Sequence, residues 1–417
     1  MTPTDHEDVP ADPPPEVSPL RLRDTIPSVA DTPAGLRRVV ADVAAGSGPV
    51  ALDAERASGY RYSGRAYLVQ LRRQGTGTVL VDPIAFEDLS DLAAAIGDAE
   101  WILHAATQDL PCLAEIGLRP HSLFDTEHAG RLLNLPRVGL ASLVETILGF
   151  SLAKEYSAAD WSTRPLPQPW LEYAALDVEV LLELREAMIG RLFDAGKLDW
   201  AHQDFEALTR FAGPPVRAEP WRRTSGIHKV RGRRALEIVR QLWLARDRVA
   251  SSRDVAPGRV LPDAVMVAVA CAPPPDGRSL RSAVAMRHRA ARKNLDAWGD
   301  AFDAALATPD HDLPPTAARV DGPPPVRSWP ERDPAAAARL AACRALVTEL
   351  GETYSLPAEN LLTPELVRRV AWEPPEPLDQ EAVSQRLREG SARPWQVGLT
   401  AVGLTEALHT QPAADSR

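Results

Sequence analysis

The stretch Val50-Ala51-Leu52-Asp53-Ala54-Glu55 decides the fold, because an apolar strand carries two carboxylates at its end. Residues two apart on a strand point to the same face, so Asp53 and Glu55 share one side of it. Two like charges are costly to bury there unless a cation lies between them or one carboxylate stays protonated. The stretch therefore indicates a cation site, and the alternative is a strand end whose acids face water.

The residues around this stretch predict one mixed α/β domain over 31–213. Strand-like runs separated by glycine-bearing turns predict an antiparallel meander over 49–54, 66–72 and 78–82. Further elements are expected on either side of it: helices over 36–45 and 89–96, a short strand over 101–104, and mostly helical periodicity up to residue 208. This pattern is typical of a central sheet covered by helices.

A third carboxylate follows the strand over 101–104. Asp109 lies five residues after His104, so we expect it on the first turn of the next helix. That position is near the sheet edge where the strand of Asp53 should also end. The alternative is an ordinary acid at a helix N-terminus, which the helix dipole stabilises.

Tyr173 and Asp177 complete the set of candidate site residues. They are four residues apart in a segment that Pro169 opens as a helix, so phenol and carboxylate lie on one helical face. With the three acids above, Asp177 gives four carboxylates. Four are enough for two divalent ions about 3.5 to 4 Å apart, the arrangement that clamps attacking and leaving oxygens in phosphodiester cleavage.

Taken together, these motifs resemble the ribonuclease D family, in the subclass of DEDD exonucleases whose third motif contains Tyr. The three exonuclease motifs correspond to Asp53-Ala-Glu55, His104 through Asp109, and Tyr173-x-x-x-Asp177. Further similar runs are Phe124-Asp125-Thr126, Ala129–Leu133 and Asp160–Leu166, and, for that family's HRDC domain, Trp221-Arg222-Arg223 and Pro257–Asp263. No acidic position departs from the family pattern.

The resemblance implies a ribonuclease-H-like α/β fold and a 3′–5′ exoribonuclease. Such an enzyme trims single-stranded RNA 3′ ends, including those of structured precursors such as tRNA, by two-metal-ion hydrolysis to nucleoside 5′-monophosphates. The resemblance also implies that Tyr173 orients the attacking water, and that two Mg²⁺ or Mn²⁺ ions are bound by Asp53, Glu55, Asp109 and Asp177. Carboxylate oxygens suit these hard ions.

Two other functions stay open at this point. One is a DNA 3′–5′ exonuclease, since nothing in the motifs reports the 2′-hydroxyl group. The other is a non-catalytic adaptor that only binds nucleic acid. The complete set of acids speaks against an adaptor, which has no need to retain carboxylates that repel one another.

Composition excludes several other classes of protein. The chain has 417 residues, 45% of them apolar, which is enough for two or three domains with real cores. No uncharged apolar stretch reaches the roughly 18 residues of a membrane span, and the N-terminus opens acidic, which predicts a cytoplasmic protein without a membrane partner. The three cysteines have no metal-ligand spacing, and glycine-rich nucleotide-binding loops are absent, so we expect neither zinc nor a nucleotide cofactor.

Positive charge is concentrated in one part of the chain. Residues 217–293 hold 18 Arg or Lys against 6 Asp or Glu, although the whole chain has a net charge of −10. This asymmetry points to nucleic acid, and the alternative is a solvated helical face. Interleaved Trp221 and His228 offer stacking surfaces for unpaired bases. The candidate nucleic-acid contacts of the whole chain are His104, Gln108, Arg164, Arg222, Arg223, Lys229, Arg231, Arg233 and Arg234.

Three side chains of the α/β domain have structural alternatives. His104 is a candidate contact for nucleic acid, but a lone histidine of this kind is more often structural. Arg164 is either a phosphate contact or the partner of Asp160 in an ion pair that holds its loop. Asp125 is expected to cap or anchor the next helix rather than to bind metal.

Composition also predicts the remaining domains. Residues 1–30 are predicted to be a disordered, acidic, proline-rich tail, because too little apolar surface is available there to offset the ordering entropy. The cationic segment predicts an all-α HRDC domain over 217–300, and eight prolines mark a linker over 308–334. A second HRDC-like helical domain is predicted over 335–417, because Leu356–Leu361 echoes Ala256–Leu261 at an offset of 100 residues.

Overall fold

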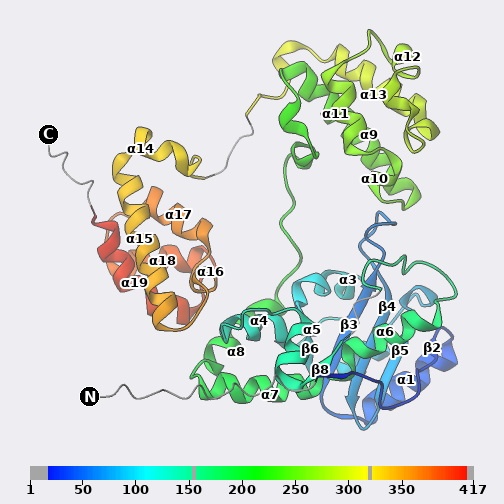
Figure 1. Cartoon of the computed structure of the whole chain (residues 1–417), viewed down its shortest axis with the longest axis vertical. Helices are drawn as coiled ribbons and strands as arrows, with labels where there is room; N and C mark the ends of the chain where they lie inside the picture. The colour runs from blue at the N-terminus through cyan, green and yellow to red at the C-terminus, as the bar shows by residue number, and fades with distance from the viewer. Residues whose placement is uncertain (1–16, 153–155, 318–321, 411–417) are drawn as a thin grey trace, which may run out of the picture.

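The computed structural model describes residues 17–152, 156–317 and 322–410, which form three domains (Figure 1). An α/β domain comes first, a middle helical domain follows, and a C-terminal helical domain ends the described chain. The middle domain lies above the α/β domain in Figure 1, and the C-terminal domain lies beside it. Every helix among the described residues is too short or too polar to span a lipid bilayer.

A mixed six-stranded sheet forms the centre of the α/β domain. The strands β3, β4 and β5 are the predicted antiparallel meander, and their neighbours β2, β6 and β7 join by parallel pairing. Their order across the sheet is β2-β5-β4-β3-β6-β7, and their bounds are Val29–Ala30 (β2), Ser47–Arg56 (β3), Ala66–Gln74 (β4), Gly77–Val81 (β5), Glu100–Leu103 (β6) and Ser122–Asp125 (β7). Because β3 lies between two other strands and is covered on both faces, Val50, Ala51 and Leu52 are fully buried.

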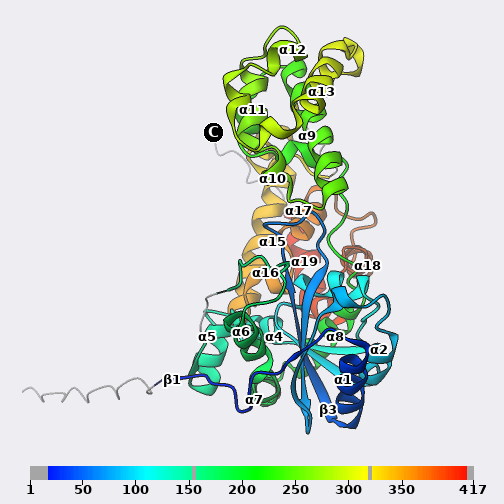
Figure 2. The same ribbon diagram turned by 90° about the vertical axis from the view of Figure 1, so that its right-hand side faces the viewer.

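Helices cover both faces of this sheet. Figure 2 shows α1 and α2 on one side and α5, α6 and α7 on the other. The helices of the domain are α1 (Pro33–Ala45), α2 (Ser90–Ile96), α3 (Leu110–Glu115), α4 (Thr126–Leu132), α5 (Leu140–Leu143), α6 (Gln168–Glu179), α7 (Leu181–Asp194) and α8 (Leu198–Thr209), with the 3₁₀ turns η1 (Pro83–Ala85) and η2 (Ala106–Gln108) and the π-helical turn η3 (Val144–Leu148). The predicted helix starts near residues 36, 89 and 169 are therefore confirmed.

The predicted N-terminal tail needs a correction. Residues 1–16 lie outside the described residues, but residues 17–30 belong to the fold. Ser18–Pro19 (β1) pairs with Phe150–Ser151 (β8), and β2 pairs with β5. Arg23 contacts the buried carboxylate of Glu179, which also receives Arg72 at 3.0 Å. These partners are distant in sequence, so composition alone gives no signal of them.

The middle domain packs its helices around Trp298 and Phe302, which are fully buried. Its elements are η4 (Pro220–Arg223), η5 (Ile227–Lys229), α9 (Arg233–Arg253), α10 (Pro257–Val260), α11 (Asp263–Cys271), α12 (Gly277–Leu280), η6 (Val284–Arg287), η7 (Ala291–Asn294), α13 (Leu295–Ala307) and η8 (Asp310–Asp312). The predicted all-helical character of this segment is confirmed. Trp221, in contrast, is 3% exposed and belongs to the core, so the prediction that it offers a stacking surface for bases is wrong.

The C-terminal domain begins earlier than its composition suggests. Its elements are η9 (Val326–Ser328), α14 (Trp329–Arg332), α15 (Pro334–Thr353), α16 (Ala358–Leu361), α17 (Pro364–Trp372), α18 (Gln380–Glu389) and α19 (Pro394–Leu408). Trp329 is fully buried, with its ring 4.8 Å from that of Trp372. The last part of the proline-rich segment over 308–334 therefore packs into this domain, because its prolines flank a large apolar anchor.

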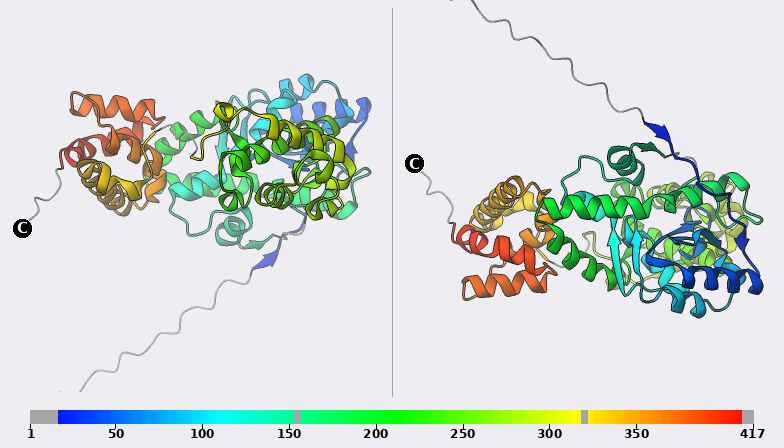
Figure 3. Two further views of the ribbon diagram at one scale, coloured as in Figure 1. Left: turned by 90° about the horizontal axis from the view of Figure 1, so that it is seen from above. Right: turned by 90° about the horizontal axis from the view of Figure 1, so that it is seen from below.

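Both helical domains contact the α/β domain. Figure 3 shows the C-terminal domain at the end of the α/β domain where α7 and α8 lie. There Trp395 stacks on Trp200 at 4.9 Å, and Arg393 lies 3.2 Å from the buried Asp204. The middle domain instead contacts residues 57–65, the loop that joins β3 to β4, where Ser63 N–H donates to Asp254 at 2.8 Å and Arg259 donates to the carbonyl of Gly59 at 2.8 Å.

Candidate active site

Three parts of the α/β domain bring the predicted acids into one cavity of about 380 Å³. Asp53 and Glu55 come from β3, and Asp109 lies between η2 and α3. Asp177 and Tyr173 come from α6, one helical turn apart. All five residues line the cavity, and His104 and Gln108 line it with them.

The carboxylates lie close enough to share a cation. One oxygen from each of Asp53, Glu55 and Asp177 lies within 4.8 Å of the others. Asp109 faces the same cavity, with its Oδ1 3.6 Å from Nη2 of Arg56. Glu55 is 8% exposed and Asp53 is half-buried, so the strand does not simply turn both acids toward water. Asp109 is 4% exposed, and its side chain makes no capping hydrogen bond to α3.

Neighbouring strands and turns hold the acids in place. Asp53 lies opposite Gln70 of β4 in the strand register, and Nε2 of Gln70 donates to Oδ2 of Asp53 at 2.7 Å. Asp125 accepts hydrogen bonds from the backbone N–H groups of Ala105 and Ala106, in the turn that leads to Asp109. The same carboxylate caps α4, as predicted.

Burial and mutual repulsion favour the protonated forms of these acids when no cation is present. Burial raises the pKa of Asp53 to about 6. Burial also raises the pKa values of Glu55, Asp109 and Asp177 well above the ordinary range, and the charge of Asp53 adds to each rise. A bound cation removes both penalties, because it neutralises the charges and replaces the lost solvent. The donor set is made of carboxylate oxygens, which fits hard divalent ions.

Tyr173 is held beside the acids as a neutral phenol. Burial and the charge of Asp177 raise its pKa, and its hydroxyl group is hydrogen-bonded to Asp177. Its ring lies against the rings of Tyr156 and Trp161, at 6.0 and 6.4 Å between centroids. The phenol oxygen is therefore held at a fixed place in the cavity, where it can accept a hydrogen bond.

His104 makes the contacts expected of a structural histidine. Its Nδ1 lies 2.9 Å from the hydroxyl oxygen of Thr126, and burial lowers its pKa, which favours the neutral ring. It lines the cavity together with Gln108. Contacts of either side chain to nucleic acid stay predictions.

Arg164 does not have either of the roles expected from the sequence. Its Nε and Nη2 donate to Asp82 at 2.6 and 2.8 Å, so the partner is Asp82 and not Asp160. Its other N–H groups donate to the backbone carbonyls of Trp161, Thr163 and Tyr67. A guanidinium has five N–H donors, and all five are engaged, so none is left for a phosphate.

The predicted cationic contacts of the middle domain fall into two groups. Arg222, Arg233 and Arg234 donate to backbone carbonyls within residues 305–315, which follow or end α13. These three arginines hold that segment against η4 and α9, which is a structural role that the sequence did not indicate. Arg223, Lys229 and Arg231 are exposed and make no hydrogen bond to that segment, and His228 lies beside them. Arg233 is exposed as well, but its Nε and Nη2 are engaged by the carbonyls of Pro314 and Leu313.

Two residues of the site were missed by the sequence analysis. Gln70 could have been found from its position opposite Asp53, but only once the pairing of β3 and β4 was known. Arg56 follows Glu55 directly, and strict alternation along a strand places it on the other face. The register of β3 and β4 shifts between Glu55 and Arg56, and the side chain of Arg56 lines the acid cavity.

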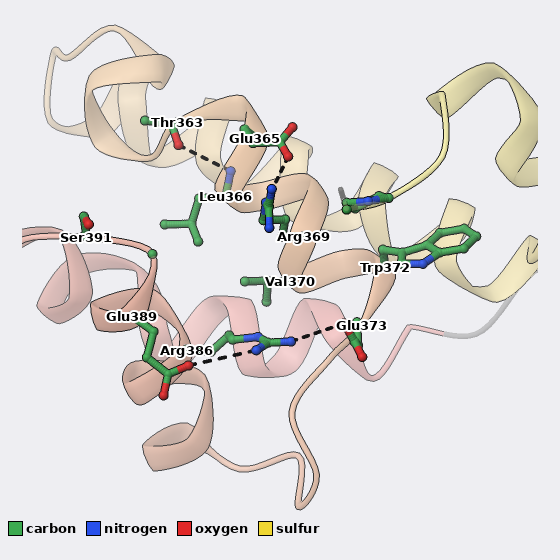
Figure 4. A pocket seen from close by; sticks show the side chains of 13 residues that line it. Thr363, Glu365, Leu366, Arg369, Val370, Trp372, Glu373, Arg386, Glu389 and Ser391 are labelled. Atoms are coloured by element: carbon green, nitrogen blue, oxygen red, sulfur yellow. Dashed lines mark hydrogen bonds and ion pairs between the residues drawn. The ribbon is translucent and has the colours of Figure 1, made fainter. Parts of the chain in front are cut away.

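A larger cavity of about 710 Å³ lies in the C-terminal domain and contains none of the predicted site residues. Figure 4 shows that its arginines lie beside glutamates. Arg369 pairs with Glu365 at 3.0 Å, and Arg386 lies between Glu373 and Glu389. Its charges are therefore compensated within the domain, which leaves the acid cavity as the candidate active site.

Comparison with known proteins agrees with this assignment. A family model described as "3'-5' exonuclease" matches residues 27–192, and one described as "HRDC domain" matches 235–301. A ribonuclease D from Gluconacetobacter diazotrophicus is 31% identical over 334 residues, which cover 78% of this chain and 81% of that protein. The chain belongs to the ribonuclease D family. It is accordingly a 3′–5′ exoribonuclease, and the family implies divalent metal ions in its active site.

Solved structures extend the ribonuclease D likeness over almost the whole chain. A crystal structure of a protein from Bifidobacterium adolescentis is 38% identical with a TM-score of 0.87, covering 95% of this chain and 100% of that one. RNase D from Escherichia coli is 25% identical with a TM-score of 0.66, covering 92% and 98%. The predicted fold class is confirmed. Residues 322–408, which overlap the domain predicted over 335–417 to be HRDC-like, match a family model described as "3' to 5' exonuclease C-terminal domain".

Proposed function

We propose that the acid cavity hydrolyses the terminal phosphodiester bond of RNA 3′ ends, with two Mg²⁺ or Mn²⁺ ions held by Asp53, Glu55, Asp109 and Asp177. The single observation that carries this proposal is the approach of three carboxylates within 4.8 Å at the end of β3, with the fourth in the same cavity. When bound, such ions supply a hydroxide-forming water and stabilise the charge on the leaving 3′ oxygen.

The side chains around the acids have supporting roles in this proposal. Tyr173 offers its phenol oxygen as a hydrogen-bond acceptor to the attacking water and so orients it, because its one hydroxyl hydrogen is engaged by Asp177. Gln70 fixes the rotamer of Asp53, because its amide holds one carboxylate oxygen at 2.7 Å. Asp125 fixes the turn that places Asp109. Each of these contacts restricts one of the proposed ligands before substrate arrives, which lowers the cost of assembling the site.

The substrate class proposed here is single-stranded 3′ ends of structured RNA precursors, such as those of tRNA. The Escherichia coli relative is described as an exoribonuclease involved in structured RNA processing, and the HRDC match supports a nucleic-acid partner. The exposed basic side chains of the middle domain are available to bind an RNA backbone outside the cavity. A DNA exonuclease and a non-catalytic adaptor are the alternatives that an assay must separate.

A direct assay uses 5′-labelled single-stranded RNA and the matched DNA, each with Mg²⁺, Mn²⁺ or chelator. We expect a ladder that shortens from the 3′ end with RNA, released nucleoside 5′-monophosphates, and no product with chelator. The Asp109→Asn variant is the matched control and should be inactive in either metal. Equal cleavage of DNA would favour the DNA exonuclease, and binding without cleavage in both metals would favour the adaptor.

A further inference from the structure

Arg56 is the one arginine or lysine that lines the acid cavity among the described residues. It is the last residue of β3, directly after Glu55. On a regular strand these two side chains would point to opposite faces. Here Glu55 pairs with Leu68 and Arg56 pairs with Ala66, so Tyr67 has no partner across the ladder. Irregularities of this kind increase the local twist and redirect side chains next to active sites.

The guanidinium of Arg56 is available for a ligand. Within the described residues its side chain makes no hydrogen bond, and its nearest charged partner is Asp109 at 3.6 Å. The side chain is 30% exposed. Arg164 offers a useful contrast, because all of its donors are engaged by the protein. An arginine whose forked donors make no hydrogen bond to the protein, at the edge of a cavity, suits a phosphate group.

Arg56 also lies where two cavities meet. A second cavity of about 280 Å³ shares Ala54, Glu55, Arg56 and Ser157 with the acid cavity. The other residues that line it are small: Ser58, Gly59, Ala158 and Ala159. A polynucleotide that leaves the acids through this second cavity would carry a phosphate past the guanidinium. The four carboxylates repel that phosphate, and Arg56 supplies the nearest compensating charge.

We propose that Arg56 binds a backbone phosphate of the RNA at the junction of the two cavities, and so positions the 3′ end over the acids. This inference rests on the proposed function of the acid cavity. It assigns Arg56 a contact with substrate, whereas Asp109 holds the guanidinium in place before the RNA arrives.

The test compares Arg56→Gln and Arg56→Lys in the full-length protein with Arg38→Gln, which removes an exposed arginine on α1 outside both cavities. Binding of a 5′-fluorescein single-stranded RNA is measured by anisotropy with Ca²⁺ in place of Mg²⁺. The flexible coordination of Ca²⁺ does not hold the reacting oxygens in line, so the RNA is bound without being cleaved. Hydrolysis of the same RNA is measured with Mg²⁺. Circular dichroism and melting temperature establish that each variant is folded.

We expect Arg56→Gln to weaken RNA binding about tenfold and to reduce the slope of log affinity against log salt by about 0.7, the value for one phosphate on a single strand. KM should rise more than kcat falls. Arg56→Lys should restore the salt slope, because the charge returns, but only part of the affinity, because the forked donors are lost. Arg38→Gln should match the wild type. If the wild type hydrolyses RNA but Arg56→Gln keeps its affinity, salt slope and KM, the inference is overturned while the proposed function stands. If the wild type itself does not hydrolyse RNA, the proposed function fails first.

Discussion

Replacing Asp53 with asparagine should stabilise the metal-free protein near neutral pH. Burial raises the pKa of Asp53 from 3.8 to about 6, so its ionised form is disfavoured in the folded state. A rise of this size corresponds to about 3 kcal/mol between the neutral and ionised forms. Asparagine has a similar shape and no charge, and its carbonyl oxygen can still accept from Gln70.

The sign of the pH dependence follows from the direction of this shift. A carboxyl whose folded pKa is raised contributes stability that is present below its unfolded pKa, and loses it as the pH rises through the folded value. For Asp53 that window runs from about pH 4 to slightly above pH 6 in chelator. A divalent ion should restore the lost stability, because it neutralises the carboxylates.

Thermal unfolding of the full-length protein checks this reasoning. For a domain of roughly 200 residues, each kcal/mol shifts Tm by about 2–4 °C, so the upper limit of the Asp53 effect is about 6–12 °C. The wild type in chelator should lose Tm between pH 5 and 7.5 and regain it with Mn²⁺, and Asp53→Asn should respond less to both. An Asp53→Asn protein that is less stable than the wild type in chelator at pH 7.5 would refute the argument.

Other substitutions test separate parts of the structure. Tyr173→Phe should reduce kcat about tenfold, the value of one hydrogen bond, whereas Asp177→Ala should reduce it by more than about a hundredfold, because a proposed metal ligand is lost; equal losses would contradict these roles. Deleting residues 1–30 should lower Tm by several degrees in a melting scan, since β2 and the Arg23 contact are removed; an unchanged Tm would show that these contacts add nothing. Asp254→Ala removes hydrogen bonds that hold the loop over 57–65 beside Arg56, so it should lower kcat/KM on a trinucleotide too short to reach the basic side chains of the middle domain. Unaltered hydrolysis would argue against a role for this loop. Replacing Arg223, Lys229 or Arg231 with Gln should in each case reduce the slope of log affinity against log salt for long RNA by about 0.7. An unchanged slope would mean that these side chains are only solvated and do not contact RNA.

The sequence was sufficient where local spacing carries the information. Alternation along one strand placed Asp53 and Glu55 together, and the four-residue spacing of Tyr173 and Asp177 placed them on one helical face. Both patterns depend only on the repeat of a strand or a helix. The position of Asp109 near the end of the Asp53 strand was also expected. The order of the strands outside the meander was not, because it depends on pairing between segments distant in sequence.

Arginine roles could not be predicted in the same way. Whether a guanidinium is free depends on which carbonyls and carboxylates surround it, and those partners are distant in sequence. Arg164 is engaged by Asp82, 82 residues earlier, and Arg233 by carbonyls about 80 residues later. Arg56 faces the acids only because the register of β3 and β4 shifts beside it. A count of basic residues therefore overestimates the number that can contact RNA.

The middle domain has two separable connections to the proposed chemistry. One is electrostatic, through its exposed basic side chains. The other consists of direct contacts. Asp254 accepts hydrogen bonds from Ser63 and Tyr67. Arg259 lies 4.1 Å from the ring of Tyr60 and donates to the carbonyl of Gly59. These contacts hold the hairpin loop over 57–65, which begins directly after Arg56.

Removing the whole middle domain would therefore disturb both connections at once. A protein that ends near residue 213 loses the basic side chains, and it also loses the partners of the loop that borders the second cavity. Reduced activity on long RNA in such a truncated chain would not show which loss is responsible. Point substitutions separate them. Changing Asp254 removes the hydrogen bonds from Ser63 and Tyr67 and so weakens the hold on the loop, while the basic character of the exposed face stays intact. Changing the exposed basic residues leaves the loop contacts in place. If catalysis on short RNA depends on the first change and affinity for long RNA on the second, then the domain both shapes the active site and binds its substrate.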